Sequence, residues 1–214
     1  MPIICPTILA ADPESYKDQI ERVAHMGNRI QIDLTDQVFA KTKTIDPALV
    51  WWPVGVKADI HLMYQEPMAA VELIIAHDPN MIIIHAEAGG DFNKLSNYCR
   101  DRKVKVGVAL LPQTSPEKLF NALAKIDHVL IFSGDLGNFG GHADLGLLSK
   151  VGILKKQKPE LEVGWDGGIN LQNIAQLVEG GVDVLNVGGY LQKAEKPEKA
   201  YSSLARIADE TGTT

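Results

Sequence analysis

Short apolar runs alternate with amphipathic segments along the whole chain. Runs of five to eight residues rich in Ile, Val and Leu predict buried strands, and the stretches between them carry apolar residues at helical spacing. The expected strands are residues 3–10, 29–35, 57–63, 81–87, 105–111, 128–133, 161–166 and 182–187. The expected helices are residues 13–26, 47–52, 67–77, 92–102, 116–126, 145–157, 171–179 and 197–209.

Strict alternation of strand and helix is typical of a parallel sheet that helices cover, because such a sheet is buried on both faces. Over eight units, 214 residues give about 27 residues per unit, which suits a short (β/α)8 barrel, or TIM barrel. A doubly wound open sheet is the alternative. We find no linker or low-complexity tract, so residues 1–214 are predicted to form a single domain.

Polar side chains stand where several of the expected strands end. Asp33, His61 and Asp166 close three of these runs, and His85 and Glu87 close a fourth. In a parallel barrel the carboxyl ends of the strands meet at one mouth, where the chemistry collects. A buried Asp or a core His by itself is usually structural. Convergence of several such groups instead indicates a shared site, holding a metal or a pair of proton carriers.

Glycines form a second group, after the sixth, seventh and eighth expected strands. They lie within residues 137–141, at Gly167 and Gly168, and at Gly188 and Gly189. Glycine lets backbone approach an anion closely, and the last two strands of many barrels form a phosphate site. Turn geometry would explain any single pair. No Gly-Lys-Ser/Thr follows residues 134–141, so this segment is interpreted as a lid and not as a nucleotide-binding loop.

Composition restricts the class of partner. The chain is 45% hydrophobic, and its 21 Lys and Arg against 27 Asp and Glu give a formal net charge of -6. Without a basic block we expect no nucleic-acid or anionic-membrane partner, because both need a continuous basic face. No run approaches the roughly 20 apolar residues of a membrane helix. The 2 cysteines indicate no disulfide framework. We expect a cytoplasmic protein that acts on a small molecule or binds protein partners.

Several motifs, in order, resemble the ribulose-phosphate 3-epimerases, which are phosphate-binding (β/α)8 barrels. They are Pro-Thr-Ile-Leu-Ala-Ala-Asp at residues 6–12, Ile-Asp-Leu-Thr-Asp at 32–36, Asp-Ile-His-Leu-Met at 59–63, His-Ala-Glu-Ala at 85–88, Phe-Gly-Gly at 139–141, Asp-Gly-Gly-Ile-Asn at 166–170 and Val-Gly-Gly at 187–189. The resemblance implies a barrel of the ribulose-phosphate-binding type and an isomerase of carbohydrate metabolism, in the pentose phosphate pathway. It also implies a homo-oligomer, either a dimer or a hexamer.

The resemblance also implies a mechanism. Asp33 and Asp166 would exchange protons with C3 of a phosphorylated ketose from opposite faces, through a metal-stabilised cis-enediolate. The metal ligands that the resemblance implies are Asp33, His61 and Asp166. Gln31 stands at the position where the family carries a fourth ligand, His. An amide oxygen is a weaker donor than imidazole, so the site should bind zinc less tightly and lean toward magnesium, manganese or iron(II). We therefore expect one divalent ion, with zinc, iron(II), manganese and magnesium all open.

The remaining site residues are carried over from the same resemblance. The implied contacts with the sugar are Thr7, His61, Met63, Gly140, Gly141 and His142. The implied phosphate contacts are Gly140, Gly141, Gly167, Gly168, Gly188 and Gly189. His85 and Glu87 match a family pair that is interpreted as support for the site. Of the other histidines, His25, His77 and His128 are expected to be solvated, and Trp51 and Trp52 are expected to anchor a helix or a subunit contact.

Three functions remain in competition. The first is interconversion of D-ribulose 5-phosphate and D-xylulose 5-phosphate. The second is a hexulose-phosphate (allulose 6-phosphate) 3-epimerase, because the residues after Asp36 depart from the family pattern. The third is a turnover-deficient barrel that only binds a sugar phosphate, which Gln31 suggests. A decarboxylase or aldolase of related barrels is less favoured, because Gly55 stands at the first acidic position of their Asp-x-Lys-x-x-Asp motif.

Overall fold

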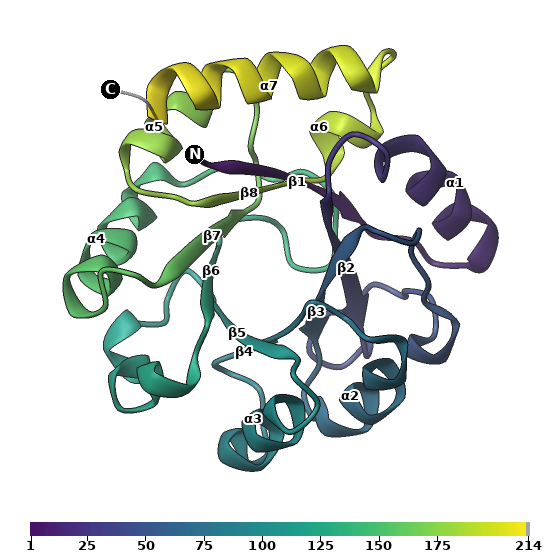
Figure 1. Cartoon of the computed structure of the whole chain (residues 1–214), viewed down its shortest axis with the longest axis vertical. Helices are drawn as coiled ribbons and strands as arrows, with labels where there is room; N and C mark the ends of the chain where they lie inside the picture. Colours follow the sequence, from purple (N-terminus) through teal and green to yellow (C-terminus); the bar gives the residue numbers. More distant parts are fainter. Residues whose placement is uncertain (213–214) are drawn as a thin grey trace.

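The computed structural model describes residues 1–212, and its strands close into a parallel barrel in the order β1 to β8 (Figure 1). The strands are β1 Ile3–Ile8, β2 Arg29–Thr35, β3 Lys57–Met63, β4 Met81–His85, β5 Lys105–Leu110, β6 His128–Phe132, β7 Glu162–Asp166 and β8 Val184–Val187. Pairing of β1 with both β2 and β8 closes the sheet. The predicted (β/α)8 barrel is confirmed, and the open-sheet alternative is wrong.

Helices form a ring around the sheet (Figure 1). The α-helices are α1 Pro13–Val23, α2 Met68–Ile74, α3 Phe92–Arg100, α4 Leu148–Gln157, α5 Ile174–Glu179, α6 Gly189–Gln192 and α7 Pro197–Gly212. The 3-10 helices are η1 Pro47–Leu49, η2 Ile75–His77, η3 Pro116–Lys125 and η4 Leu145–Leu147. The sequence of α1 explains why it is a helix. The Asp12 side chain caps its first turn by accepting a hydrogen bond from the Ser15 N–H. Its buried face consists of Tyr16, Ile20 and Val23.

The expected elements differ from the structure mainly at their ends. The helix expected over residues 47–52 is only the 3-10 turn η1, since Val50 is already extended and Pro53 disfavours helical backbone at the residue before it. The α-helix expected over residues 116–126 is instead the 3-10 helix η3, which ends at Lys125. α6 was not predicted, because a four-residue helix that begins at Gly189 leaves no periodic pattern.

Side chains inside the barrel are distinct from those between the sheet and the helices. Met81, Ile83, Ala109 and Leu130 form their own buried apolar cluster, apart from the large core that the helices share with the outer face of the sheet. Inward positions alternate along each strand, so this apolar layer separates polar groups at the two ends of the barrel. The polar groups at the carboxyl ends of the strands are the candidate site.

One expected surface residue is buried instead. His128, the first residue of β6, is 1% exposed, and its Nδ1 lies 2.8 Å from Oε1 of Glu162. The prediction that His128 is solvated is wrong, because an inward position at the start of a barrel strand is as enclosed as one at its end.

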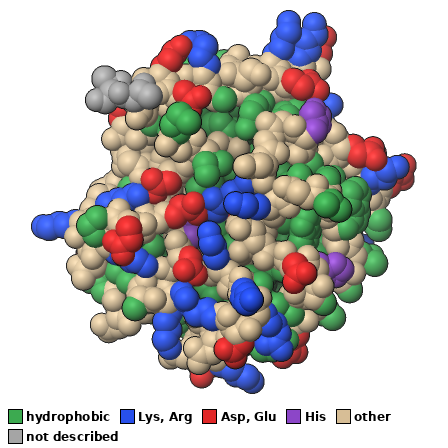
Figure 2. Space-filling model, viewed as in Figure 1, with side chains coloured by type: hydrophobic (Ala, Val, Ile, Leu, Met, Phe, Trp, Pro, Cys, Tyr) green, Lys and Arg blue, Asp and Glu red, His purple; other side chains and the backbone are tan. Residues whose placement is uncertain are grey.

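The surface carries both signs of charge. On the face in Figure 2, basic and acidic side chains are interspersed and form no continuous basic area. Among residues 1–212, no helix combines the length and the apolar character needed to cross a membrane.

Candidate active site

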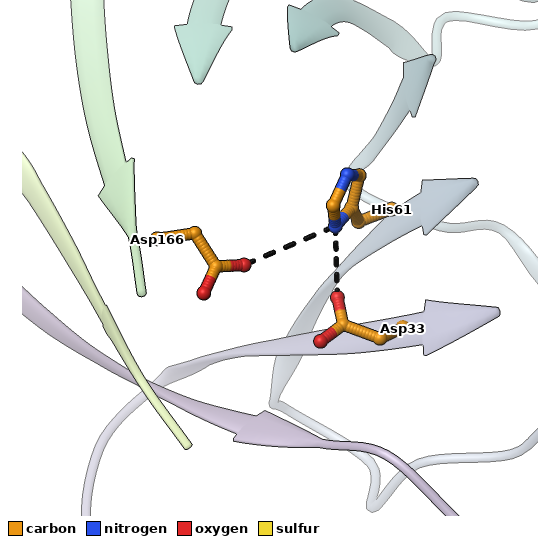
Figure 3. A group of neighbouring side chains, drawn as sticks. All are labelled: Asp33, His61 and Asp166. Atoms are coloured by element: carbon orange, nitrogen blue, oxygen red, sulfur yellow. Dashed lines mark hydrogen bonds and ion pairs between the residues drawn. The ribbon is translucent and has the colours of Figure 1, made fainter. Parts of the chain in front are cut away.

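Asp33, His61 and Asp166 converge at the carboxyl mouth of the barrel, from β2, β3 and β7 (Figure 3). Asp33 and His61 are paired in the register of neighbouring strands. His61 Nδ1 lies 3.0 Å from Oδ1 of Asp33 and 3.9 Å from Oδ2 of Asp166. One ligand atom from each residue lies within 4.8 Å of the other two. The convergence expected from the strand ends is thus present.

Gln31 joins this group from one inward position below Asp33 on β2. Its Nε2 donates to Oδ1 of Asp33 at 2.9 Å and to Oδ2 of Asp166 at 2.6 Å. Its Oε1 is buried and has no hydrogen-bond partner among the described residues. The amide N–H groups therefore bridge two carboxylates that would otherwise repel each other.

Burial governs the electrostatics of the group. It raises the pKa of Asp33 to about 8, against the opposing effect of the Gln31 hydrogen bond. Burial and the charge of Asp33 raise the pKa of Asp166 to about 7. Burial lowers the pKa of His61 to about 4, so this ring is neutral at pH 7. Within residues 1–212, neither carboxylate has an ion pair with Lys or Arg, so the site lacks positive charge.

The donor set fits a divalent metal ion. Two carboxylates and an imidazole nitrogen are ligands that zinc, iron(II) and manganese accept, and their spacing allows them to surround one ion. Half a turn of the Gln31 amide would direct the unpartnered Oε1 at the same point and move its N–H groups away. The buried orphan oxygen and the missing positive charge both indicate that these residues could hold a cation.

His61 is fully buried, whereas Asp33 and Asp166 open onto a cavity. Its lining includes Asp33 and Asp166, and the remaining lining residues are Thr7, Leu9, Met63, Phe132, Gly134, Gly137, Asn138, Phe139, Gly140, Gly167, Gly168, Ile169, Asn186, Gly188, Gly189 and Tyr190. Several polar atoms here are buried and unpartnered among residues 1–212, namely Oγ1 of Thr7 and both Oδ1 and Nδ2 of Asn186. Buried polar atoms without partners are rare, which favours a polar ligand in this cavity.

Residues 3–192 match the sequence model of the Ribulose-phosphate 3 epimerase family. The chain belongs to this family. It is 31% identical over 215 residues to the ribulose-phosphate 3-epimerase of Mycobacterium leprae, with 97% of this chain and 95% of the relative covered. It is 27% identical over 208 residues to the enzyme of Schizosaccharomyces pombe, with 94% and 91% covered. The chain is therefore an epimerase, of the isomerase class, that acts on a sugar phosphate.

Solved structures agree on the fold. KGPDC from Streptococcus mutans superimposes with a TM-score of 0.75 at 10% identity, covering 99% of both chains. The 3-hexulose-6-phosphate synthase of Salmonella typhimurium gives a TM-score of 0.73 at 11% identity, covering 98% of this chain and 99% of that one. At such low identity these similarities establish the barrel and nothing about the reaction.

The glycines at the tips of β7 and β8 have a packing reason to be glycine. A Cβ on Gly167 would lie 2.1 Å from the backbone nitrogen of Gly134, and one on Gly168 would lie 2.2 Å from that of Ala143. A Cβ on Gly188 would lie 2.7 Å from the Phe139 ring. Residues 134–143 therefore close down onto the strand tips only because these positions lack side chains. Anion binding is a second role, compatible with this one.

The other expected contact residues divide into two groups. Thr7, Met63 and Gly140 line the cavity, as do Gly167, Gly168, Gly188 and Gly189. Gly141 and His142 are exposed and do not line it. The carbonyl oxygen of His142 instead accepts a hydrogen bond at 3.3 Å from Oγ of Ser133, the residue just before the 134–141 segment.

Asn186 and Phe139 are cavity residues that the sequence reasoning missed. Asn186 is a single polar residue in the apolar run of β8, placed next to Asp166 in the register. A polar side chain within a strand that is otherwise buried and apolar was the available signal. Phe139 begins the Phe-Gly-Gly motif at residues 139–141, but only the glycines of that motif are predicted contacts, because aromatic residues are ordinary in both loops and cores.

Proposed function

We propose that this enzyme inverts C3 of a phosphorylated ketose, with D-ribulose 5-phosphate and D-xylulose 5-phosphate as the substrate pair. The observation that carries the proposal is the pair of buried carboxylates, Asp33 and Asp166, at the floor of one cavity. Their strands, β2 and β7, are separated in the barrel by β1 and β8. Two carboxylates that reach one cavity from different sides suit proton transfer to and from opposite faces of one carbon.

The proton inventory of the pair supports this chemistry. Epimerisation needs one carboxylate that accepts the C3 proton and one carboxylic acid that donates a proton to the other face. Burial and mutual repulsion bring the pKa values of Asp33 and Asp166 to about 8 and about 7, so the pair holds a proton near neutral pH. Gln31 donates to both carboxylates and orients them.

We further propose that Asp33, His61 and Asp166 hold a divalent metal ion, with Gln31 as a weaker fourth ligand through Oε1. Zinc, iron(II), manganese and magnesium remain the candidates. When bound, the ion supplies positive charge for the enediolate oxygens that loss of the C3 proton creates. The protein's own part is to exclude water beneath the lid, to hold the carboxylates at the reacting carbon and to keep His61 neutral.

The rest of the cavity is proposed to bind the substrate. Thr7, His61, Met63 and Asn186 would contact the sugar, and Gly140, Gly167, Gly168, Gly188 and Gly189 would offer backbone to the phosphate. Gly141 and His142, exposed in this structure, would contact substrate only after the lid moves. A homo-oligomer and a cytoplasmic location stay predictions of the family resemblance.

Solvent exchange at C3 tests the proposal directly. In D2O, the wild-type enzyme should exchange the C3 hydrogen of D-ribulose 5-phosphate, and NMR would follow the loss of that signal. Asp33→Asn and Asp166→Asn should each slow exchange by roughly 10³-fold or more. Asp46→Asn, at the exposed cap of η1, is the matched control. Wild-type exchange in both active-site variants would end the proposal.

A hexulose phosphate is the second candidate, and Asn186 favours it. Allulose 6-phosphate carries one more hydroxyl group than a pentulose phosphate, and Asn186 offers a donor and an acceptor that have no partner within the described part of the chain. Rates with the two sugar phosphates would decide between them, and a clear preference for the pentulose would end the second candidate. Because both carboxylates are retained, the turnover-deficient alternative is not favoured, and substantial metal-stimulated turnover would exclude it.

A further inference from the structure

A chain of four side chains runs from the metal-binding position into the wall of the barrel. Asp33 Oδ1 lies 3.0 Å from Nδ1 of His61, and Nε2 of His61 lies 2.9 Å from Nε2 of His85. Nδ1 of His85 then lies 3.5 Å from Oε2 of Glu87. Both imidazoles are buried, and the rings of Phe39 and Phe132 pack against that of His85. The chain thus connects two carboxylates through two rings.

Counting protons shows that this chain is incomplete. It has three contacts, and each needs one hydrogen to be a hydrogen bond. Two neutral imidazoles supply only two N–H groups. One of these lies between the two Nε2 atoms, so the other faces either Asp33 or Glu87. Whichever carboxylate is left faces a nitrogen lone pair, unless a further proton or a cation lies between them.

The surroundings of Glu87 decide which end receives the N–H. Its Oε1 accepts from the backbone N–H of Leu111 at 3.2 Å. Its Oε2 and Nδ1 of His85 have no hydrogen-bond partner among the described residues, so each is the available partner of the other. Burial raises the pKa of Glu87, but His85, Thr114 and Leu111 together lower it to about 2, so Glu87 is an anion at neutral pH. An anion next to Nδ1 favours a proton on that nitrogen.

We infer that Glu87 and His85 are positioning residues that keep Nδ1 of His61 unprotonated and directed at the metal position. With the proton of His85 on Nδ1, the Nε2 lone pair of His85 must accept a hydrogen bond from the Nε2–H of His61. The Nδ1 lone pair of His61 then faces Asp33 and Asp166, where a divalent cation completes the chain. The inference rests on the metal site proposed above, and it deepens that proposal by naming the residues that set the tautomer of its imidazole ligand.

Glu87→Gln should reverse the direction in which the hydrogen bonds of this chain are donated. Because the Leu111 N–H holds one oxygen of Glu87, the carbonyl of the new Gln would keep that bond and its NH2 would donate to Nδ1 of His85. His85 would then carry its proton on Nε2, and His61 would direct an N–H at the metal position. We expect the affinity for Zn2+, measured by chelator competition, to fall roughly 10- to 100-fold. Glu72→Gln, an equal charge change at an exposed position of α2, should leave the affinity unchanged.

Substitutions at His85 separate positioning from simple packing. His85→Gln places an amide oxygen near the lost Nε2, where it can accept from His61, so Zn2+ affinity should stay within a few-fold of the wild type. His85→Leu fills the volume without an acceptor and should weaken Zn2+ binding at least tenfold. Equal affinities in folded His85→Gln and His85→Leu proteins would overturn the inference, as would a Glu87→Gln affinity within twofold of the wild type.

The wild-type protein gives a direct readout without any substitution. In the Zn2+-loaded protein labelled with 15N at histidine, long-range 1H–15N NMR should identify His85 as the Nδ1–H tautomer and His61 as the Nε2–H tautomer. His85 with its proton on Nε2, or a wild type that fails to bind Zn2+, would overturn the inference. None of these measurements uses turnover. If the C3 exchange test contradicted the epimerase proposal but NMR identified the expected tautomers, this inference would therefore still hold.

Discussion

Buried charges lie at both ends of the barrel interior, and the two groups are built differently. At the amino ends of the strands, Nε of Arg29 donates to Oδ2 of Asp59 at 2.6 Å. Its Nη1 and Nη2 donate to the two carboxylate oxygens of Glu162 at 2.9 and 2.8 Å. His128 and Asn80 bond the same two carboxylates. At the carboxyl ends, the partners of Asp33 and Asp166 among residues 1–212 are the neutral side chains of Gln31 and His61.

The pKa values express this difference. Although burial acts to raise the pKa of Glu162, hydrogen bonds from His128 and Arg29 hold it well below its ordinary value. Burial keeps the pKa of Asp59 raised, with Arg29 and Asn80 opposing it. At the other end burial is scarcely opposed, and the pKa values of Asp33 and Asp166 lie near neutrality. Paired carboxylates stabilise the barrel, whereas unpaired ones suit proton transfer or a cation.

Removing the cation at the amino end should have the largest effect. Arg29→Met leaves Asp59 and Glu162 without their guanidinium, so the free energy of unfolding should fall by about 3–5 kcal/mol. Urea unfolding at neutral pH measures it. The control is Arg206→Met, which breaks the exposed pair with Glu210 on α7 and should cost less than about 0.5 kcal/mol. Equal losses in the two variants would contradict a stabilising role for the amino-end group.

Raising the pH should destabilise the metal-free protein through the carboxyl end. A carboxyl group whose folded pKa is raised contributes stability below its unfolded pKa, and that stability is lost as the pH rises through the folded value. The stability that Asp33 and Asp166 contribute is therefore lost as the pH rises to about 8. His61, with its pKa lowered to about 4, acts in the opposite sense below its ordinary value of 6.5.

The two carboxyl groups therefore dominate the window between pH 6.5 and 8, because His61 and His85, whose pKa values burial lowers to about 4, act mainly below it. Across it, the free energy of unfolding should fall by about 1–2 kcal/mol in the presence of a chelator. Saturating Mn2+ should remove the decrease, because the bound ion compensates both charges. The double variant Asp33→Asn/Asp166→Asn should remove it as well. A decrease of equal size in the double variant would place its origin elsewhere in the protein.

The two ends also differ in how far the sequence predicted them. The convergence of Asp33, His61 and Asp166 followed from the barrel, because the carboxyl ends of parallel strands meet. The Gln31 bridge did not follow, since it depends on a side-chain conformation reaching from β2 toward β7. The prediction for His128 fails because the start of a barrel strand can be as buried as its end. Apolar alternation predicts strands well, but it does not say which polar inward residue pairs with which.

Replacing Gln31 by the imidazole found in the family should make the carboxyl end a stronger metal site. Gln31→His exchanges an amide oxygen for a nitrogen ligand that zinc prefers, so Zn2+ affinity should rise roughly tenfold, or about 1.4 kcal/mol. Chelator competition on the purified protein checks this. Gln172→His adds an imidazole at an exposed position and should change nothing. An unchanged affinity in Gln31→His would argue against an ion at this end of the barrel.

Asn186 tests whether unpartnered polar atoms at the carboxyl end serve the substrate or the fold. Its side chain is 3% exposed and makes no hydrogen bond among the described residues, so the protein gains nothing from its polarity. Asn186→Val should keep or slightly raise the unfolding temperature, because it removes buried polar atoms that lack partners. KM for the sugar phosphate should rise about fivefold, equivalent to one lost hydrogen bond of about 1 kcal/mol. A lower unfolding temperature with unchanged KM would make Asn186 a structural residue, like the charged side chains at the amino end.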